Sequence, residues 1–412
     1  MKFSEFNFDS RLAEGIDASG YEDATPVQEQ VIPLVLQGKD VIASAQTGTG
    51  KTAAFLLPLI NNILSEPFDE HSITALVIVP TRELAIQIAQ HMEGLSYFTS
   101  VSSIAVYGGG DGNAFIQEKK ALSHGADVVI CTPGKMIAHI NMGYVKLKGL
   151  KYLVLDEADR MLDMGFYDDI MRIINALPAK RQNLLFSATM PPKIREMAKK
   201  ILHNPAEINI AISKPNEKIT QLAYVVYETQ KIPLVKYILH QKEFSSVLVF
   251  CSSKQSVKQL TRELKRTRLA VDEIHSDLEQ EKREEVLMYF KSGRLKVLVA
   301  TDILSRGIDI DNIGLVINYD VPHDGEDYVH RIGRTARAAA EGTAITFISE
   351  KEQRKFQRIE QLLGKEVHKE KIPEQFGEGP EYRKAHHTHQ SGQGHRNGKR
   401  PNKFNRNGPS KR

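Results

Sequence analysis

Ten short apolar runs, each followed by a turn and then a helical pattern, constrain the fold of this chain more than any other feature. The first half contains DVIAS, ALVIV, DVVIC, KYLVLD and QNLLFS, and the second half contains SVLVF, VDEIH, KVLVA, LVINY and TAITFI. Runs of four or five apolar residues without alternation are typical of parallel strands covered by helices on both faces. The pattern therefore predicts an α/β fold with right-handed crossovers.

The two series of strands are separated by HNPAEINIAISKPNEKITQ, which has two prolines and no strong period. We place a linker at 207–218 in this segment. A chain of 412 residues is long enough for two or three domains. We therefore predict one lobe over 1–206, a second over 219–367, and a tail over 368–412.

The basic charge is concentrated at the C-terminus. Nine of the 55 Lys and Arg lie in residues 382–412, which contain no Asp or Glu, so the rest of the chain carries a net charge of about −5. The tail is rich in Gly, Asn, Gln, His and Pro, and this composition predicts disorder. A basic arm suits a polyanion, most simply RNA, and Tyr382 and Phe404 could stack on bases. The alternative is a solubilising tail.

Several classes of protein are excluded by composition. The N-terminus, MKFSEFNFDS, has acidic residues and no apolar core, so it does not resemble a secretory signal. No apolar run approaches the roughly 20 residues of a membrane helix, so no membrane partner is expected. Cys131 and Cys251 each follow an apolar run, which favours packing at strand ends over catalysis and fits a reducing, cytoplasmic location.

The segment VIASAQTGTGKTAAFLLPLI has the strand, loop and helix of a phosphate-binding P-loop. Gly48 and Gly50 let backbone N–H groups curl around phosphate oxygens, Lys51 reaches the β- and γ-phosphates, and Thr52 suits Mg²⁺. The alternative is a glycine-rich turn without a ligand. The nucleotide-contacting loop is predicted to comprise Ala45, Gln46, Thr47, Gly48, Thr49, Gly50, Lys51 and Thr52.

A pair of carboxylates follows the apolar run KYLVL. Asp156 is placed to hold Mg²⁺ through water, and Glu157 is placed to activate the attacking water as a general base. The alternative is that this acidic pair only caps the following helix. Together with the P-loop, the pair predicts ATP hydrolysis with Mg²⁺.

The tetrad DEAD at 156–159, together with AQTGTGKT, resembles the DEAD-box ATP-dependent RNA helicases. The resemblance extends over residues 1 to about 365, and RMLDMGF and HRIGRTARAAAEG are similar to the bacterial RhlE-type members. It implies two tandem RecA-like P-loop domains with parallel sheets, an ATP-binding site and an RNA-binding surface.

The resemblance also implies roles for individual residues. In GYEDATPVQ it assigns adenine recognition to Gln28, and the further nucleotide contacts it implies are Phe3, Tyr21, Gly307 and Asp309. The implied RNA contacts, from PTRELA, GG, TPGK, QEKR and ATDILSRGIDI, are Pro80, Thr81, Arg82, Gly108, Gly109, Thr132, Pro133, Gly134, Arg283, Thr301 and Asp302. The residues implied to couple ATP state to unwinding are Asp159, Ser187, Thr189 and His330. Lys135 stands where the family commonly has arginine, which loses a bidentate fork.

The segment HRIGRTARAAAEG spaces Arg331, Arg334 and Arg337 by three residues, which predicts one face of a helix. On the residues alone, a solvated basic helix is the simpler interpretation. The resemblance instead implies that Arg334 and Arg337 reach the γ-phosphate, while Arg331 holds the motif through carboxylate partners. Ala336, in place of a family glycine, raises helix propensity.

The expected activity is ATP hydrolysis stimulated by RNA and coupled to lobe closure. Closure would drive local, non-processive separation of short RNA duplexes or remodelling of ribonucleoproteins, such as ribosomal or RNA-decay particles. The chain is expected to act as a monomer. The alternatives are an ATP-dependent RNA clamp and a DNA translocase with a similar core.

Overall fold

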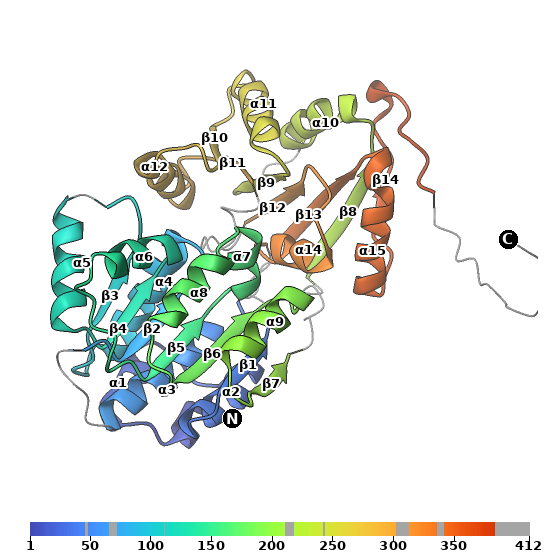
Figure 1. Cartoon of the computed structure of the whole chain (residues 1–412). Coiled ribbons are helices and arrows are strands. Elements are labelled where there is room, and N and C mark those ends of the chain that lie inside the picture. Colours follow the sequence, from blue (N-terminus) through green and yellow to red (C-terminus); the bar gives the residue numbers. More distant parts are fainter. Residues whose placement is uncertain are drawn as a thin grey trace, which may run out of the picture.

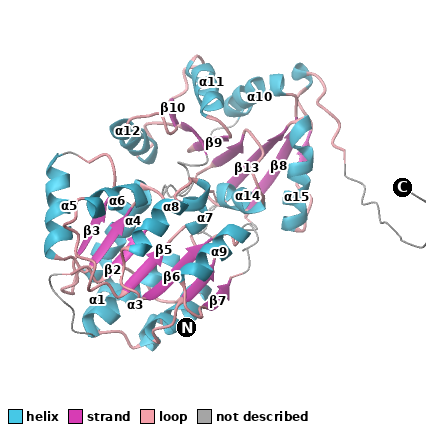
Figure 2. Cartoon of the chain, in the orientation of Figure 1, coloured by secondary structure: helices cyan, strands magenta, loops and turns pink. Residues whose placement is uncertain are grey.

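The computed structural model describes residues 1–45, 48–65, 72–110, 112–210, 218–241, 244–301, 313–335 and 342–383. These residues form two α/β lobes, each built on a parallel sheet of seven strands (Figure 1). Figure 2 shows that helices surround each sheet. The predicted α/β fold with two tandem RecA-like lobes is confirmed.

The first sheet is buried between two groups of helices. Alternate residues of its central strands enter two separate apolar clusters, as expected of a sheet covered on both faces. Its strands, in spatial order, are β3 (Ser103–Val106), β4 (Val128–Cys131), β2 (Ala75–Ile78), β5 (Tyr152–Leu155), β6 (Gln182–Ser187), β1 (Val41–Ser44) and β7 (Ala206–Asn209). The helices of this lobe are η1 (Phe3–Phe6), α1 (Ser10–Ala18), α2 (Pro26–Leu36), α3 (Lys51–Ser65), α4 (Arg82–Ser96), α5 (Gly112–His124), α6 (Pro133–Asn141), α7 (Ala158–Asp163), α8 (Tyr167–Asn175) and α9 (Pro192–Ile201).

The second sheet has the same connectivity as the first. Numbered within each lobe, both sheets follow the spatial order 3-4-2-5-6-1-7. The strands of the second sheet are β10 (Val271–Ile274), β11 (Val297–Thr301), β9 (Val247–Cys251), β12 (Leu315–Asn318), β13 (Gly342–Ile348), β8 (Ile219–Val225) and β14 (His368–Glu370). Its helices are α10 (Glu228–Gln241), α11 (Lys254–Lys265), α12 (Gln280–Lys291), α14 (Gly325–Ile332), η2 (Glu350–Glu352), α15 (Gln353–Leu363) and η3 (Glu374–Phe376).

The predicted linker begins too early. Residues of β7 pair in parallel with β1, so 207–209 belong to the first sheet. Only Ile208 of this edge strand is buried, and such a short half-polar strand has no continuous apolar run to reveal it. The rest of the linker, 211–217, lies outside the described residues.

The predicted disordered tail also begins too early. Strand β14 pairs with the edge strand β8, and Phe376 packs against the core of the second lobe. The hydroxyl of Tyr382 donates to Glu360 at 2.7 Å. A few apolar anchors therefore extend the lobe to residue 383, although the average composition of the segment is polar. Residues 384–412, including Phe404, lie outside the described part.

Both cysteines are buried at the ends of strands β4 and β9, as the sequence predicts. Burial raises the pKa of the Cys131 thiol far above its ordinary value, which suits packing rather than nucleophilic chemistry. In the part of the chain that the structure describes, no helix is long and apolar enough to cross a membrane.

Candidate active site

The P-loop connects β1 to α3 at the carboxyl end of the first sheet. Gly48 and Gly50 have φ angles of 80° and 91°, in the left-handed region that favours glycine. Lys51 is only 6% exposed, and its ammonium donates to the carbonyl oxygen of Ala45 at 2.7 Å. The ammonium therefore lies across the loop that the sequence assigns to phosphate. Gln46 and Thr47 lie outside the described residues.

The N-terminal segment packs against the P-loop. The side chain of Gln28 is buried, accepts from the Thr25 amide at 2.8 Å, and donates to the carbonyl oxygen of Gly50 at 3.1 Å. A methyl group at Gly50 would come within 2.5 Å of this side chain. Phe3 and Tyr21 lie edge to face, 5.5 Å apart. The structure thus brings Gln28 to the P-loop, while its contact with an adenine base stays a prediction.

Asp156 and Glu157 follow β5, two strands away from β1 in the sheet. Burial raises the pKa of Asp156 to about 6, against the opposing effect of Lys51. The carboxylate accepts from the Glu157 amide at 2.9 Å. Glu157 has a φ of 51°, a strained backbone angle that reorients the chain at the start of α7.

Arg160 is a site residue that the sequence analysis missed. Its guanidinium donates to the Glu157 carboxylate at 3.0 Å, and both side chains are largely buried. The (i, i+3) spacing of an acid and an arginine in DEADR was a usable signal. This pair fixes the position of the predicted general base.

Asp159 joins the DEAD tetrad to the SAT motif at the end of β6. Its carboxylate accepts from the backbone and hydroxyl of Thr189 at 2.9 and 3.0 Å. The Asp159 amide donates to the Ser187 hydroxyl at 3.2 Å, and Ala45 donates to the Ser187 carbonyl at 3.1 Å. The P-loop, the DEAD tetrad and the SAT motif therefore form one hydrogen-bonded unit. The fourth predicted coupling residue, His330, lies on α14 of the other lobe.

The arginine segment is not one continuous helix. Helix α14 ends at Ile332, and Gly333 caps it, so Arg334 lies in the following turn. Thr335 then forms a bridge with Ile313, and its hydroxyl donates to the carbonyl oxygen of that residue. The helix therefore does not continue through Thr335. The prediction of one helical face is therefore wrong. Arg334 is 7% exposed.

Arg331 is buried rather than solvated. It donates to the Asn318 side chain at 3.2 Å and to the Asp320 carbonyl at 3.1 Å, and its guanidinium lies 5.1 Å from the centre of the Phe250 ring. The solvated-helix alternative is thus excluded for this residue. The expected holding role is retained, with an amide and a carbonyl oxygen among its partners.

The predicted RNA contacts of the first lobe lie together at the carboxyl ends of β2, β3 and β4. Thr81 caps α4, and Arg82 donates to the carbonyl oxygens of Gly108 and Gly109 at 3.5 and 3.3 Å. Thr132 precedes α6, with Pro133 at its first position. Threonine hydroxyls and helix starts suit phosphate groups.

The lobes contact each other at this same edge. Arg82 donates to Glu284 of α12 at 2.7 Å, and Arg283 lies 3.8 Å from Glu83. The sequence analysis missed both glutamates, because pairs separated by about 200 positions leave no local pattern. Arg82 and Arg283 therefore have carboxylate partners across the interface.

Lys135 belongs to a largely buried polar cluster below the TPG motif. Its ammonium lies 2.9 Å from the carboxylate of Glu118 and 5.3 Å from the centre of the Phe115 ring. The same carboxylate lies 3.1 Å from Nε2 of His139, whose Nδ1 contacts the Tyr144 hydroxyl. Lys135 is thus held away from solvent by Glu118.

The remaining predicted site residues divide into two groups. Pro80 and Thr301 are buried at strand ends, whereas Gly134 is exposed. Thr49 is half-buried, as is Thr52 in the first turn of α3. Besides Gln46 and Thr47, the predicted site residues outside the described part of the chain are Asp302, Gly307, Asp309, Ala336 and Arg337.

Comparisons with known proteins agree with this geometry. A family model described as DEAD/DEAH box helicase matches residues 25–197, and one described as helicase conserved C-terminal domain matches 230–339. The chain is 44% identical over 367 residues to ATP-dependent RNA helicase CshA of Listeria monocytogenes, covering 89% of this chain and 69% of that protein. It is 41% identical over 374 residues to DEAD-box ATP-dependent RNA helicase CshA of Bacillus subtilis, covering 90% and 74%.

A solved structure shows the same architecture. S. cerevisiae Dbp5 bound to RNA and ADP BeF3 superposes with a TM-score of 0.79 at 31% identity, covering 90% of this chain and 95% of that chain. Two α/β lobes with a P-loop joined to a DEAD tetrad define a P-loop nucleoside triphosphatase of the helicase class. The chain belongs to the DEAD-box ATP-dependent RNA helicases.

Proposed function

We propose that this helicase hydrolyses ATP in response to RNA and uses lobe closure to separate short duplexes locally or to remodel ribonucleoproteins. The observation that carries the proposal is the hydrogen-bonded unit of P-loop, Asp159, Ser187 and Thr189. It connects the predicted nucleotide loop to the strand ends near the second lobe. A change at the phosphate can therefore alter how the lobes fit together.

The residues that would hold Mg²⁺ are Thr52 and Asp156. Asp156 is a carboxylate whose pKa is raised chiefly by burial, and oxygen donors suit this ion. When bound, Mg²⁺ would polarise the phosphate oxygens and neutralise developing charge.

The proposed chemical roles of the side chains follow from their positions. Lys51 binds the β- and γ-phosphates once they replace the Ala45 carbonyl as its partner. Glu157, fixed by Arg160, accepts a proton from the attacking water. Arg334 and Arg337 would stabilise charge on the γ-phosphate, and such arginines contribute about 10³–10⁵ in rate.

RNA would bind across the edge where both lobes supply phosphate-directed groups. Thr81, Thr132 and the start of α6 offer hydroxyl and backbone donors, which give affinity without reading sequence. The similarity to the structure of S. cerevisiae Dbp5 bound to RNA and ADP BeF3 supports this proposal. Binding would require Arg82 to exchange its Glu284 partner for phosphate. Ribosomal or RNA-decay particles, a monomeric state and a cytoplasmic location remain proposals.

The subgroup is a separate question. The relatives reported above are named CshA, and they do not support the RhlE-type assignment suggested by RMLDMGF and HRIGRTARAAAEG. The assignment to the DEAD-box family does not depend on the subgroup.

Steady-state ATP hydrolysis with and without RNA tests this function. Wild-type turnover should rise with single-stranded RNA and not with DNA of the same length. Glu157→Gln should retain ATP binding and lose about 10²–10⁴ in kcat, because the general base is removed. Glu14→Gln, on the exposed face of α1, is the matched control and should behave as wild type.

Three results would contradict the proposal. An ATP hydrolysis rate that does not change with RNA would exclude closure coupled to RNA binding. Equal stimulation by DNA would favour a DNA translocase. ATPase stimulation without strand separation would favour an RNA clamp.

A further inference from the structure

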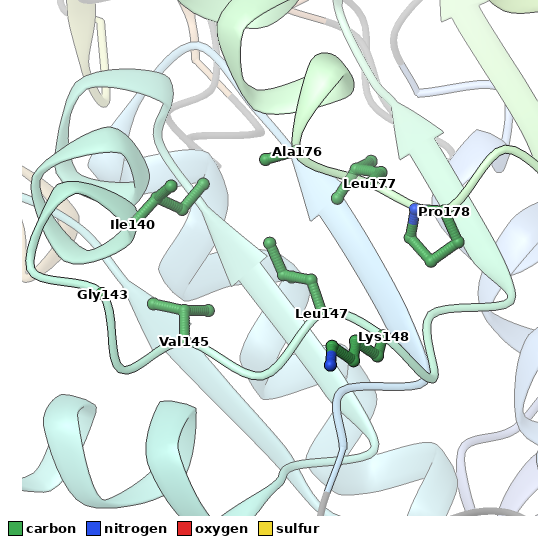
Figure 3. A pocket seen from close by; sticks show the side chains of 8 residues that line it. All are labelled: Ile140, Gly143, Val145, Leu147, Lys148, Ala176, Leu177 and Pro178. Carbon is green, nitrogen blue, oxygen red and sulfur yellow. The ribbon is translucent and has the colours of Figure 1, made fainter.

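A cavity of about 460 Å³ opens at the end of the first lobe opposite the nucleotide site. Its walls come from the loops that follow α6 and α8 (Figure 3). These loops lead into the amino ends of β5 and β6, whereas Asp156 and Ser187 mark the carboxyl ends. Strands of this length span about 13 Å or more. A molecule in this cavity, which we call the α6–α8 pocket, would leave the nucleotide site open.

Most of the residues that line the α6–α8 pocket are apolar. Leu147 and Leu177, 7% and 9% exposed, are the buried residues among them. In Figure 3 the side chain of Leu147 lies between Val145 on one side and Leu177 and Pro178 on the other. The volume falls within the range of ligand pockets, about 300–1,000 Å³. The pocket therefore suits one bulky apolar side chain.

The walls are fixed by hydrogen bonds before anything binds. The Ser72 hydroxyl accepts from the Gly149 amide at 2.8 Å and donates to the Lys146 carbonyl at 3.3 Å. On the other wall, the Arg181 guanidinium donates to the Pro178 carbonyl at 2.6 Å and to Asn183 at 2.8 Å. A preformed pocket lowers the ordering cost of binding.

The chain segments that form the pocket walls are basic. Lys148 lines the pocket, and Lys146 and Lys180 lie within two positions of other lining residues. Residues 141–155 and 170–187 contain six Lys and Arg and no Asp or Glu, although the chain before residue 382 is net acidic. The exposed ammonium groups of Lys146, Lys148 and Lys180 form no ion pair with any described residue. These three lysines beside a mostly apolar lining indicate an acidic partner.

We propose that the α6–α8 pocket binds an acidic segment of a partner protein. One apolar side chain of the segment contacts Leu147 and Leu177, and flanking carboxylates pair with Lys146, Lys148 and Lys180. The basic C-terminal tail of this chain would be repelled from the rim. Single-stranded RNA is disfavoured because none of the lining residues is aromatic, and sequence-tolerant RNA sites stack bases on aromatic rings.

A library of random displayed peptides, selected against the full-length protein, tests the proposal. Enriched peptides should contain one bulky apolar residue flanked by Asp and Glu. A fluorescent copy should bind about tenfold more weakly to Lys146→Glu/Lys148→Glu, because charge pairs are reversed, and to Ala176→Tyr, which fills the mouth. Ala176 is exposed, so the larger side chain leaves the core intact.

The matched control is Lys193→Glu/Lys199→Glu, which reverses two exposed charges on α9 of the same lobe and should bind as wild type. The proposal is overturned if no enriched peptide loses affinity for the rim and mouth variants. It is also overturned if an RNA oligonucleotide crosslinks to Lys146 or Lys148, which would make this face part of the RNA surface. Peptide binding needs no ATP turnover, so its outcome is independent of the helicase mechanism.

Discussion

The two lobes share one strand connectivity but use the same position in opposite ways. In the first lobe Lys51 follows β1, and Asp156 follows β5. In the second lobe the equivalent strands are β8 and β12, and they are followed by Lys231 and Asp320. Lys231 is fully buried, and its ammonium lies 2.9 Å from the Asp320 carboxylate.

The electrostatics of the two positions differ accordingly. Asp156 has a pKa raised by burial, so its charge is poorly compensated. Burial acts in the same direction at Asp320, but Lys231 and the Ser252 hydrogen bonds outweigh it and lower the pKa of that carboxyl. The Glu352 carboxylate also lies near, 3.5 Å from the Lys231 ammonium. In the second lobe, charged side chains neutralise one another at this position, whereas in the first lobe the position is available to a charged ligand.

The loops account for this difference between the lobes. The first lobe has Gly48 and Gly50 at positive φ, which leaves backbone N–H groups accessible to phosphate. In the second lobe only Val226 and Tyr227 connect β8 to α10, and neither is a glycine. Equal topology therefore gives a binding site in one lobe and a stabilising ion cluster in the other, because only one loop can surround an anion.

The largest difference is expected at the two lysines. Lys51→Met should lower kcat/KM for ATP by about 10³, since a cation aimed at the phosphates is lost. Stability should not fall, because the variant removes a buried charge. ATPase kinetics and urea unfolding would measure both, with the exposed Lys39→Met as the control. Retained ATPase activity would make the two positions equivalent.

Lys231→Met should produce the opposite result. It leaves Asp320 as a buried carboxylate without its cation, and breaking such a pair costs about 3 kcal/mol of folding free energy. Urea unfolding of the full chain measures this loss. Lys231→Met/Asp320→Leu should recover part of it, since both charges are then gone. No loss in the single variant would show that the cluster is not stabilising.

Asp156→Asn should stabilise the protein in a pH-dependent way. The folded pKa of Asp156 is about 6, above the ordinary 3.8, so ionisation opposes folding as pH rises from 4 to 6. Above pH 6 the variant should be more stable by about 3 kcal/mol, and below pH 4 the difference should vanish.

The comparison for this prediction is unfolding in EDTA at pH 4 and pH 8. Asp320→Asn is the matched variant in the second lobe, and it should be less stable than wild type at pH 8 because it weakens the pair with Lys231. A gain in stability from both variants would remove the contrast between the lobes.

Sequence alone predicted the candidate nucleotide site of the first lobe better than the ion cluster of the second lobe. The strands before Lys51 and Asp156 are continuous apolar runs, and glycines mark the loop. Strands β3, β7, β8 and β14 were missed because they are short or mix polar and apolar residues. Pairs such as Arg82 with Glu284 join residues distant in sequence. The helix end at Ile332 depends on a bridge to Ile313, which opposes the local alanine signal.

The smallest expected effect concerns the edge of the second sheet, where β14 takes the place that β7 has in the first. Tyr382→Phe removes the hydrogen bond to Glu360 and should cost about 1 kcal/mol of stability. Deletion of 384–412 should leave stability unchanged and weaken RNA binding, whereas deletion of 368–412 should also remove β14 and destabilise the lobe. Urea unfolding and RNA titrations at several salt concentrations separate these outcomes. If the two deletion variants unfold at the same urea concentration, β14 does not stabilise its lobe. The edge strands β7 and β14 would then not be equivalent.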